Sequence, residues 1–319
     1  MAIHTSRTQR GAHSANGGVF GAISSSGGGA TASGQPDDYE GPLDVVPGAV
    51  LALGNWAMSA ATRGSPLYTI REDSGDTEQS FNSNAITGLA PEASIATFLG
   101  VNNGFISLWN NYGTDINIES LIQPVLELQP KWITDGTTTS VPCFSDSDGA
   151  TFSQLSQVPM DTSFEAITIF AVSQIDSDAS PAAGFFDADA DAGDGMEFIV
   201  STGEVLGFGC FDATVTNEVN VTTDPGACTL DAFHIFEVKG SSNATMEFRV
   251  DGVVKAITAS AGNGVFGPII ALYPNTLIRR AADANTRLAA LLIYDSVLSA
   301  ADCLAVRQNI ATRCGITLP

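Results

Sequence analysis

Apolar and polar residues alternate over short stretches through most of the chain beyond residue 140. Glycine, asparagine and aspartate separate these stretches at short intervals. Alternation with a period of two, interrupted by turn residues, predicts the antiparallel strands of a β-sandwich. The predicted strands are 165–174, 184–188, 196–200, 204–211, 233–239, 245–251, 253–259, 265–273 and 287–294. Asp251-Gly252 lies between two of these segments and predicts a tight hairpin turn.

Helical spacing replaces this alternation in two places. Ser299–Arg313 carries apolar residues along one helical face, and Ser299 can cap its first turn. Residues 90–99 form a shorter candidate helix with Pro91 in the first turn. Many strands followed by one long helix predict an all-β fold. We expect an antiparallel jelly-roll sandwich with a C-terminal helix and an extended N-terminal arm.

The beginning of the chain differs in composition from the rest. Residues 1–36 are rich in glycine and serine and offer few side chains that could form a core. We therefore predict an extended docking arm over residues 1–40 and one β-sandwich domain over residues 41–319.

The arm also differs from the body in charge. Residues 1–36 contain Arg7 and Arg10 and no acidic residue, so residues 37–319 carry −24 of a chain total of −22. A basic arm on an acidic body suits docking on an acidic neighbouring subunit, with Arg7 and Arg10 as the docking residues. The alternative is a disordered tail with two incidental arginines.

The net charge and the hydropathy exclude several classes of partner. A net charge of −22 repels phosphate backbones, so we expect no nucleic-acid partner. Residues 1–19 lack the apolar core of a signal peptide, and no apolar run reaches the ~18 residues needed to cross a membrane. We therefore expect a protein that is made in a cytoplasm and has no membrane span.

Five cysteines give an odd count, which leaves at least one thiol unpaired within the chain. Cys303 lies on the predicted C-terminal helix and Cys314 just after it, about 16 Å apart, which is too far for a bridge between them. Two interpretations remain open for this pair: buried thiols, or disulfides to another chain. The remaining cysteines are Cys143, Cys210 and Cys228, and no spacing among the five suggests zinc.

An acidic segment at residues 185–198 is a candidate calcium site. Carboxylates at near-alternate positions can converge on Ca²⁺, although Ala192 and Phe198 stand where an EF-hand loop has glycine and glutamate. The alternative is a solvated acidic turn between strands. The carboxylates are those of Asp187, Asp189, Asp191 and Asp194. No other cofactor is predicted.

A cluster of aromatic and amide side chains is a candidate carbohydrate site. It consists of Trp109, Asn110, Asn111 and Tyr112. Aromatic faces and amides are typical of sugar contacts, but Trp109 can equally be a core residue and the asparagines turn residues. The three histidines are widely spaced along the chain, so the sequence suggests no hydroxyl–histidine–carboxylate arrangement.

Two blocks resemble known families. The segments MEFRVDGVVKA and LLIYDSVLSAADCLAVRQNIATRCGI resemble the concanavalin A-like lectin/glucanase, or laminin-G-like, jelly roll over residues 140–316. Upstream, PLYTIREDSGDTEQSF, FLGVNNGFISLWNNYG and QPVLELQPKWITDG resemble the catalytic domain of fungal family-54 α-L-arabinofuranosidases and bacteriophage virion proteins with this jelly roll. Asn110-Asn111 replaces the Asp-Gln pair of the hydrolases, and their nucleophile motif has no counterpart here, so no catalytic residue is assigned.

The resemblance implies a non-enzymatic structural protein of a bacteriophage virion. It would be a fibre, a collar or baseplate appendage, or a capsid decoration, assembled in the host cytoplasm. Its arm would contact other virion proteins. We expect the protein to form a homo-oligomer, with a trimer favoured over other oligomers. The alternatives are a carbohydrate-binding module that recognises a host surface glycan and an arabinofuranosidase-like glycoside hydrolase.

Overall fold

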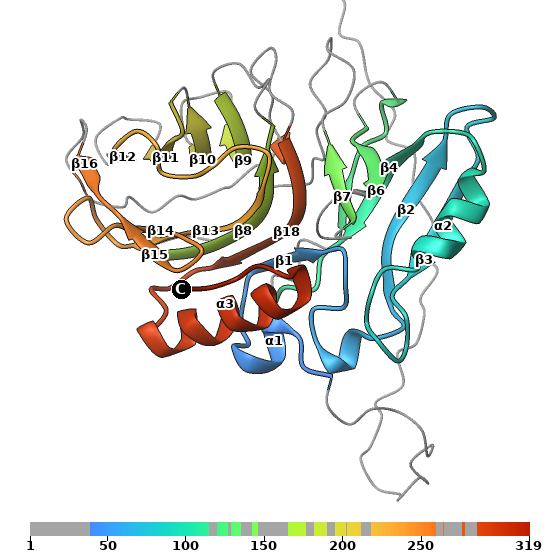
Figure 1. Ribbon diagram of the computed structural model, residues 1–319, viewed down its shortest axis with the longest axis horizontal. Helices are drawn as coiled ribbons and strands as arrows, with labels where there is room; N and C mark the ends of the chain where they lie inside the picture. The colour runs from blue at the N-terminus through green and yellow to red at the C-terminus, as the bar shows by residue number, and fades with distance from the viewer. Residues whose placement is uncertain are drawn as a thin grey trace, which may run out of the picture. The chain divides into compact units, whose positions relative to one another are not determined.

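Two antiparallel sheets form the fold (Figure 1). The computed structural model describes residues 39–114, 120–126, 129–134, 142–145, 165–176, 182–189, 195–201, 203–211, 218–259, 264, 276–277 and 286–319. All of them belong to the unit Pro36–Pro319. The predicted arm lies outside the described residues except for its last two.

The larger sheet has 12 strands among the described residues. Its order is β15 (Val253–Lys255), β14 (Glu247–Val250), β13 (Phe233–Gly240), β8 (Ile167–Ile175), β18 (Thr286–Tyr294), β7 (Pro142–Ser145), β6 (Lys131–Thr134), β4 (Gly104–Asn110), β2 (Pro66–Glu72) and β3 (Glu78–Asn82). In addition, β1 (Leu51–Gly54) pairs with β18, and β5 (Ser120–Ile122) pairs with β4.

The smaller sheet covers one face of the β8–β13–β14 region. Its order is β16 (Ile257–Ala259), β12 (Glu218–Thr223), β11 (Val205–Phe211), β10 (Gly195–Ser201), β9 (Ala182–Asp189) and β17 (Thr276–Leu277). Aromatic rings fill the space between the sheets: the centroids of Phe185 and Phe236 are 4.6 Å apart, and those of Phe198 and Phe248 are 6.2 Å apart. Because these rings are buried, they hold the two sheets together, and the predicted sandwich is confirmed.

The C-terminal helix α3 (Ala300–Cys314) covers the opposite face of the larger sheet, next to the short helix α1 (Pro42–Val45) (Figure 1). The hydroxyl of Ser299 accepts a hydrogen bond from the Asp302 amide, 3.1 Å away, and Gly315 ends the helix in the left-handed conformation. Apolar residues of α3 pack with Phe170 and Tyr294, whose rings meet edge to face. The sheet is therefore buried on both faces here, which explains why every residue of β8 is buried.

A buried ion pair joins α3 to the sheet. The Arg307 guanidinium donates to the carboxylate of Glu237 on β13, and the two side chains are 7% and 0% exposed. Seventy residues separate the partners, so the pair had no local sequence signal.

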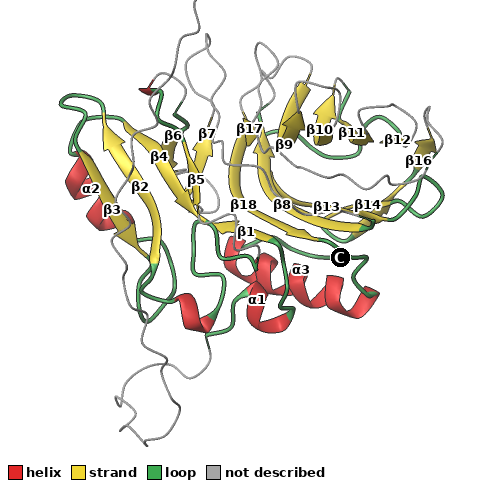
Figure 2. Ribbon diagram, turned by 180° about the vertical axis from the view of Figure 1, so that it is seen from behind, coloured by secondary structure: helices red, strands yellow, loops and turns green. Residues whose placement is uncertain are grey.

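The strand boundaries confirm most of the predicted pattern and correct one part of it. Residues 253–259 were expected to form one strand, but the chain passes from β15 in the larger sheet to β16 in the smaller sheet. Strand β12 was not predicted, and residues 265–273 lie outside the described residues. The shorter predicted helix is α2 (Glu92–Leu99), beside β2 and β3 (Figure 2). None of the described helices is long and apolar enough to cross a membrane.

Candidate functional site

A pocket of about 390 Å³ opens where β13 and β14 meet the loop before β13 and the last residues of the chain. We call it the His234 pocket. Its polar side chains are those of Thr229, His234, Asp251, Lys255 and Thr317. Its apolar side chains are those of Ala227, Val250, Val253, Leu318 and Pro319, and Gly226 and Cys228 complete the lining.

His234 is held in the pocket by hydrogen bonds at both ring nitrogens. Nδ1 lies 2.6 Å from Oδ2 of Asp251, and Nε2 lies 2.9 Å from the Thr229 hydroxyl and 3.0 Å from the Thr229 carbonyl oxygen. A carboxylate only accepts, so Nδ1 carries a proton. Nε2 accepts from the hydroxyl when the ring is neutral and donates to the carbonyl when the ring is protonated. The side chains of His234 and Asp251 are 12% and 21% exposed.

The hairpin turn between β14 and β15 positions Asp251. Asp251 and Gly252 have φ angles of 51° and 86°, as the predicted tight turn requires. The Asp251 amide donates to the carbonyl of Ile235 over 2.9 Å, and its Oδ1 accepts from the Ile235 amide over 2.8 Å. These bonds fix the carboxylate against the start of β13, where His234 lies.

The loop that carries Thr229 is anchored on both sides. The amides of Gly226 and Ala227 donate to the carbonyls of Gly203 and Glu204, over 2.8 and 3.0 Å. Farther along, the amide of Asp231 donates to the carbonyl of Ile175 over 2.8 Å. The pocket wall is therefore pre-formed by strand ends and anchored backbone, as ligand sites commonly are.

Two further side chains decide what chemistry the pocket can support. Burial raises the pKa of the Cys228 thiol to about 11, and the charge of Glu204 adds to this effect, whereas Lys255 opposes it. The thiol therefore stays protonated near neutral pH and is a poor nucleophile. The Lys255 ammonium influences Cys228 from the same pocket.

The sequence did not indicate this grouping. Thr229, His234 and Asp251 come from a loop, a strand and a turn, five and 17 residues apart along the chain. Contrary to the expectation from histidine spacing, the structure brings a hydroxyl, an imidazole and a carboxylate into contact. The Asp251-Gly252 turn was the one local signal in the sequence. It predicted the hairpin but not the contact between Asp251 and His234.

The predicted carbohydrate cluster has a structural position instead. Trp109 is fully buried and donates from Nε1 to the carbonyl of Gly54 over 3.2 Å, so its ring has no face for a sugar. Asn111 Oδ1 accepts from the amides of Ala52 and Gly113, both over 2.8 Å. This is the core-and-turn alternative that the sequence left open.

The two neighbouring side chains of that cluster also bind within the chain. Asn110 Oδ1 accepts from the hydroxyl of Ser120 over 3.0 Å, and the Tyr112 hydroxyl donates to the carbonyl of Pro66. Burial raises the pKa of Tyr112 to about 12. Both side chains thus fasten the end of β4 to its neighbours.

The predicted calcium and docking residues are only partly described. Asp187 and Asp189 belong to β9, where they pair in register with Glu197 and Gly195 of β10. Asp191, Asp194, Arg7 and Arg10 lie outside the described residues, so the calcium and docking sites stay predictions. Within the described part of the chain, no three His, Cys, Asp or Glu side chains gather as metal ligands.

Cys303 and Cys314 both point into the packed side of α3. They are free thiols and are 1% and 0% exposed. Burial is the main cause that raises the pKa of each to about 12. A bridge to another chain would require α3 to move off the sheet, which favours the alternative of buried thiols.

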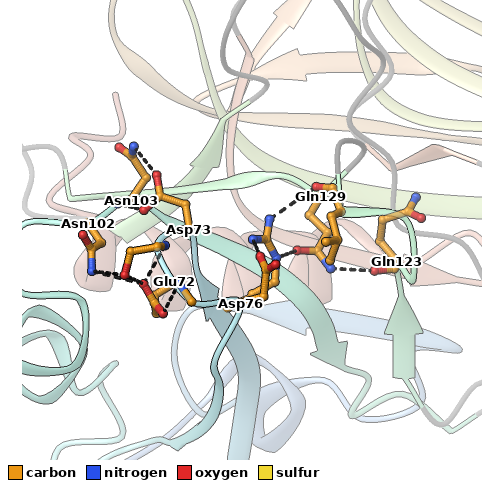
Figure 3. A network of polar contacts seen from close by, with 11 residues as sticks. Glu72, Asp73, Asp76, Asn102, Asn103, Gln123 and Gln129 are labelled. Atoms are coloured by element: carbon orange, nitrogen blue, oxygen red, sulfur yellow. Dashed lines mark hydrogen bonds and ion pairs between the residues drawn. The ribbon is translucent and has the colours of Figure 1, made fainter.

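A polar network at the end of β2 is a second cluster of charged groups (Figure 3). Arg71 donates to Asp76 over 2.6 Å and to Gln129 over 2.7 Å. Glu72 accepts from the amide and hydroxyl of Ser74, which lower the pKa of the Glu72 carboxyl. Because these groups satisfy one another, the network joins the β2–β3 turn to neighbouring loops and leaves little for a ligand.

A larger pocket of about 680 Å³ lies between α3 and Tyr39. Its lining has two charged residues, Glu40 and Arg313, and the cation is committed within the chain: the Arg313 guanidinium lies 4.2 Å from the Tyr39 ring centroid and donates to the carbonyl of Glu40. The Arg63 guanidinium lies 5.2 Å from the same ring centroid. The His234 pocket therefore offers the more available chemistry.

Solved structures of family-54 α-L-arabinofuranosidases share this fold. One in complex with arabinofuranosyl-α-1,2-xylobiose has a TM-score of 0.56 at 14% identity over 86% of this chain. Another, with a cyclic sulfate inhibitor, has a TM-score of 0.54 at 14% identity over 86% of this chain. This chain covers 65% of the length of each. At such identity the likeness shows the fold alone, and it agrees with the resemblance of the upstream block.

A carbohydrate-binding module of family 40 from a Ruminococcus gnavus sialidase, bound to α2,3 sialyllactose, is more distant. Its TM-score is 0.33 at 12% identity, over 45% of this chain and 83% of the module, which is too weak to support an inference. No family model matches the sequence, and no curated protein matches it.

Proposed function

We propose that this protein is a carbohydrate-binding β-sandwich and that a sugar occupies the His234 pocket. The observation that carries the proposal is the division of the lining into two chemistries. Thr229 and Lys255 offer hydrogen-bonding groups, while Val253 and Leu318 offer aliphatic surface. A sugar ring presents hydroxyls at its edge and C–H groups on its faces, so it can use both at once. A volume of about 390 Å³ is in the range of ligand sites.

The shared fold supports a saccharide over other small ligands. The arabinofuranosidase of similar fold is complexed with arabinofuranosyl-α-1,2-xylobiose, which supports a saccharide as the class of ligand. Fold alone does not transfer a site, and the proposal therefore rests on the side chains of the pocket.

Several acidic side chains already have partners within the chain, which fits a protein that binds a sugar without cleaving it. Asp251 already binds His234 and the backbone of Ile235. Of the other acids considered from the sequence, Glu237 pairs with Arg307 and Glu247 pairs with Arg249. A glycosidase needs two carboxyl groups free to act on one glycosidic bond. We therefore expect no hydrolysis of a chromogenic arabinoside by the full chain, and turnover that a carboxylate substitution abolishes would revive the hydrolase alternative.

Glycan binding by the full chain tests the proposal directly. Thr229→Val removes a hydroxyl from the pocket with little change in shape, and we expect about tenfold weaker binding of any glycan that an array detects. Thr97→Val is the matched control, because the Thr97 hydroxyl bonds only the backbone of α2. An array without hits would refute the proposal, and equal weakening by both variants would place the sugar elsewhere.

A docking role in a virion is the second candidate function, and the charge distribution favours it. Residues 37–319 carry −24, whereas the only charged side chains of residues 1–36 are two arginines. A glycan-binding body displayed by a docking arm would combine both hypotheses. Deletion of residues 1–36 should abolish incorporation into a particle and leave a folded body; incorporation at the normal level would refute the docking role.

A further inference from the structure

Lys255 differs from most basic residues of the described chain in having no partner. Five of the others pair with a carboxylate: Arg71, Lys239, Arg249, Arg287 and Arg307. Lys255 forms no hydrogen bond or ion pair through its ammonium with any described residue, although the chain has a net charge of −22. In so acidic a protein, an uncommitted ammonium in a pocket wall is informative.

The acidic residue of the pocket has other partners than Lys255. Asp251 is the one acidic residue of the described lining, and its oxygens accept from the Ile235 amide and the His234 ring. Lys255 acts on Cys228, since its charge lowers the pKa of that thiol against the effect of burial. Lys255 therefore lines the pocket close enough to the loop of Cys228 and Thr229 for its charge to act there.

The geometry points to an acidic saccharide as the ligand, with its carboxylate bound by Lys255 and a hydroxyl bound by Thr229. This inference rests on the proposed function and names the class of sugar. A carboxylate–ammonium hydrogen bond is stronger than a neutral one, and Asp251, the one acidic residue among the described residues of the lining, already accepts hydrogen bonds at both oxygens.

The acidic body restricts the form of this ligand. Charges farther than ~8 Å from the pocket are largely screened at physiological ionic strength, so the charged residues of the lining, Lys255 and Asp251, contribute most to the local field. A long polyanion would also meet the other acidic surfaces of a chain with a charge of −22. We therefore expect recognition of a single acidic residue, such as a terminal uronic acid, instead of an extended acidic polysaccharide.

The test compares acidic and neutral sugars that share one ring. The full chain is titrated calorimetrically with the methyl glycosides of glucuronic and galacturonic acid and of glucose and galactose. We expect the uronate of the preferred stereochemistry to bind about tenfold more tightly than its neutral counterpart. Lys255→Gln should remove this difference and leave the weaker neutral binding in place.

Lys131→Gln provides the matched control. It makes the same change in net charge, and Lys131 lies on β6, outside the His234 pocket. It should retain the preference for the uronate. Unfolding midpoints of both variants check that the fold is intact.

The outcomes separate this inference from the proposed function. Equal binding of neutral and acidic sugars, or a loss of preference in both lysine variants, overturns the inference and leaves sugar binding in place. Acetate binding as tightly as the uronate, with no response to Thr229→Val, overturns the sugar proposal and leaves an anion site. If none of the glycosides binds at millimolar concentration, both fail.

Discussion

Removal of Glu237 tests whether the buried ion pair holds α3 on the sheet. Glu237→Leu leaves the Arg307 guanidinium 7% exposed and without its carboxylate. Loss of one partner of a buried pair costs about 3–5 kcal/mol, because the remaining charge stays desolvated. The double variant Glu237→Leu with Arg307→Met removes both charges and should recover most of that loss, since a well-packed apolar pair avoids the desolvation cost.

The assay is urea unfolding of the full chain, followed by circular dichroism, for the wild type, both single variants and the double variant. The coupling energy of this cycle should be about 3 kcal/mol or more. The matched control is the Glu247–Arg249 pair, whose side chains are 31% and 24% exposed at 2.7 Å. Its cycle should give less than about 1 kcal/mol. A Glu237–Arg307 coupling as small as that of the control pair would refute the reasoning.

Three further predictions follow from burial and backbone geometry. Cys303 and Cys314, with pKa values raised to about 12, should react with a disulfide reagent at pH 8 only on unfolding; labelling at the rate of free cysteine would contradict their burial. Burial raises the pKa of Tyr39 and of Tyr112 to about 12, so the folded chain keeps protons that the unfolded chain loses above pH ~10. The unfolding free energy should therefore fall between pH ~10 and ~12, and a flat profile in urea titrations would oppose this. Gly252→Ala forces a φ of 86° on a residue with a side chain and should cost about 1 kcal/mol of unfolding free energy; an unchanged urea midpoint would mean that the turn relaxes.

Much of the fold could be predicted because its signals are local. Alternation marks β10, β11 and β13, and the Ser299 cap and Gly315 mark the ends of α3. The passage from β15 to β16 had no such signal. Ala256 alone separates the two strands, and no glycine or proline marks the break. The local pattern thus described strands without assigning them to sheets.

The site was harder to predict because it depends on contacts between distant segments. His234 looked isolated in the sequence, and only the pairing of β13 with β14 places it beside the Asp251 turn. Trp109, with two asparagines and a tyrosine after it, had the composition of a sugar site and proved to be core. Composition identifies side chains that can bind a sugar, whereas burial decides which of them are available.

Nuclear magnetic resonance of the His234 ring tests directly whether a sugar occupies the His234 pocket. Imidazole signals of the full chain are assigned with His234→Gln and followed during titration with the best glycan from the array. The account predicts a saturable shift of the His234 signals with the affinity found by calorimetry, and constant signals from His4 and His13. A glycan that binds with no change at His234 would contradict the account.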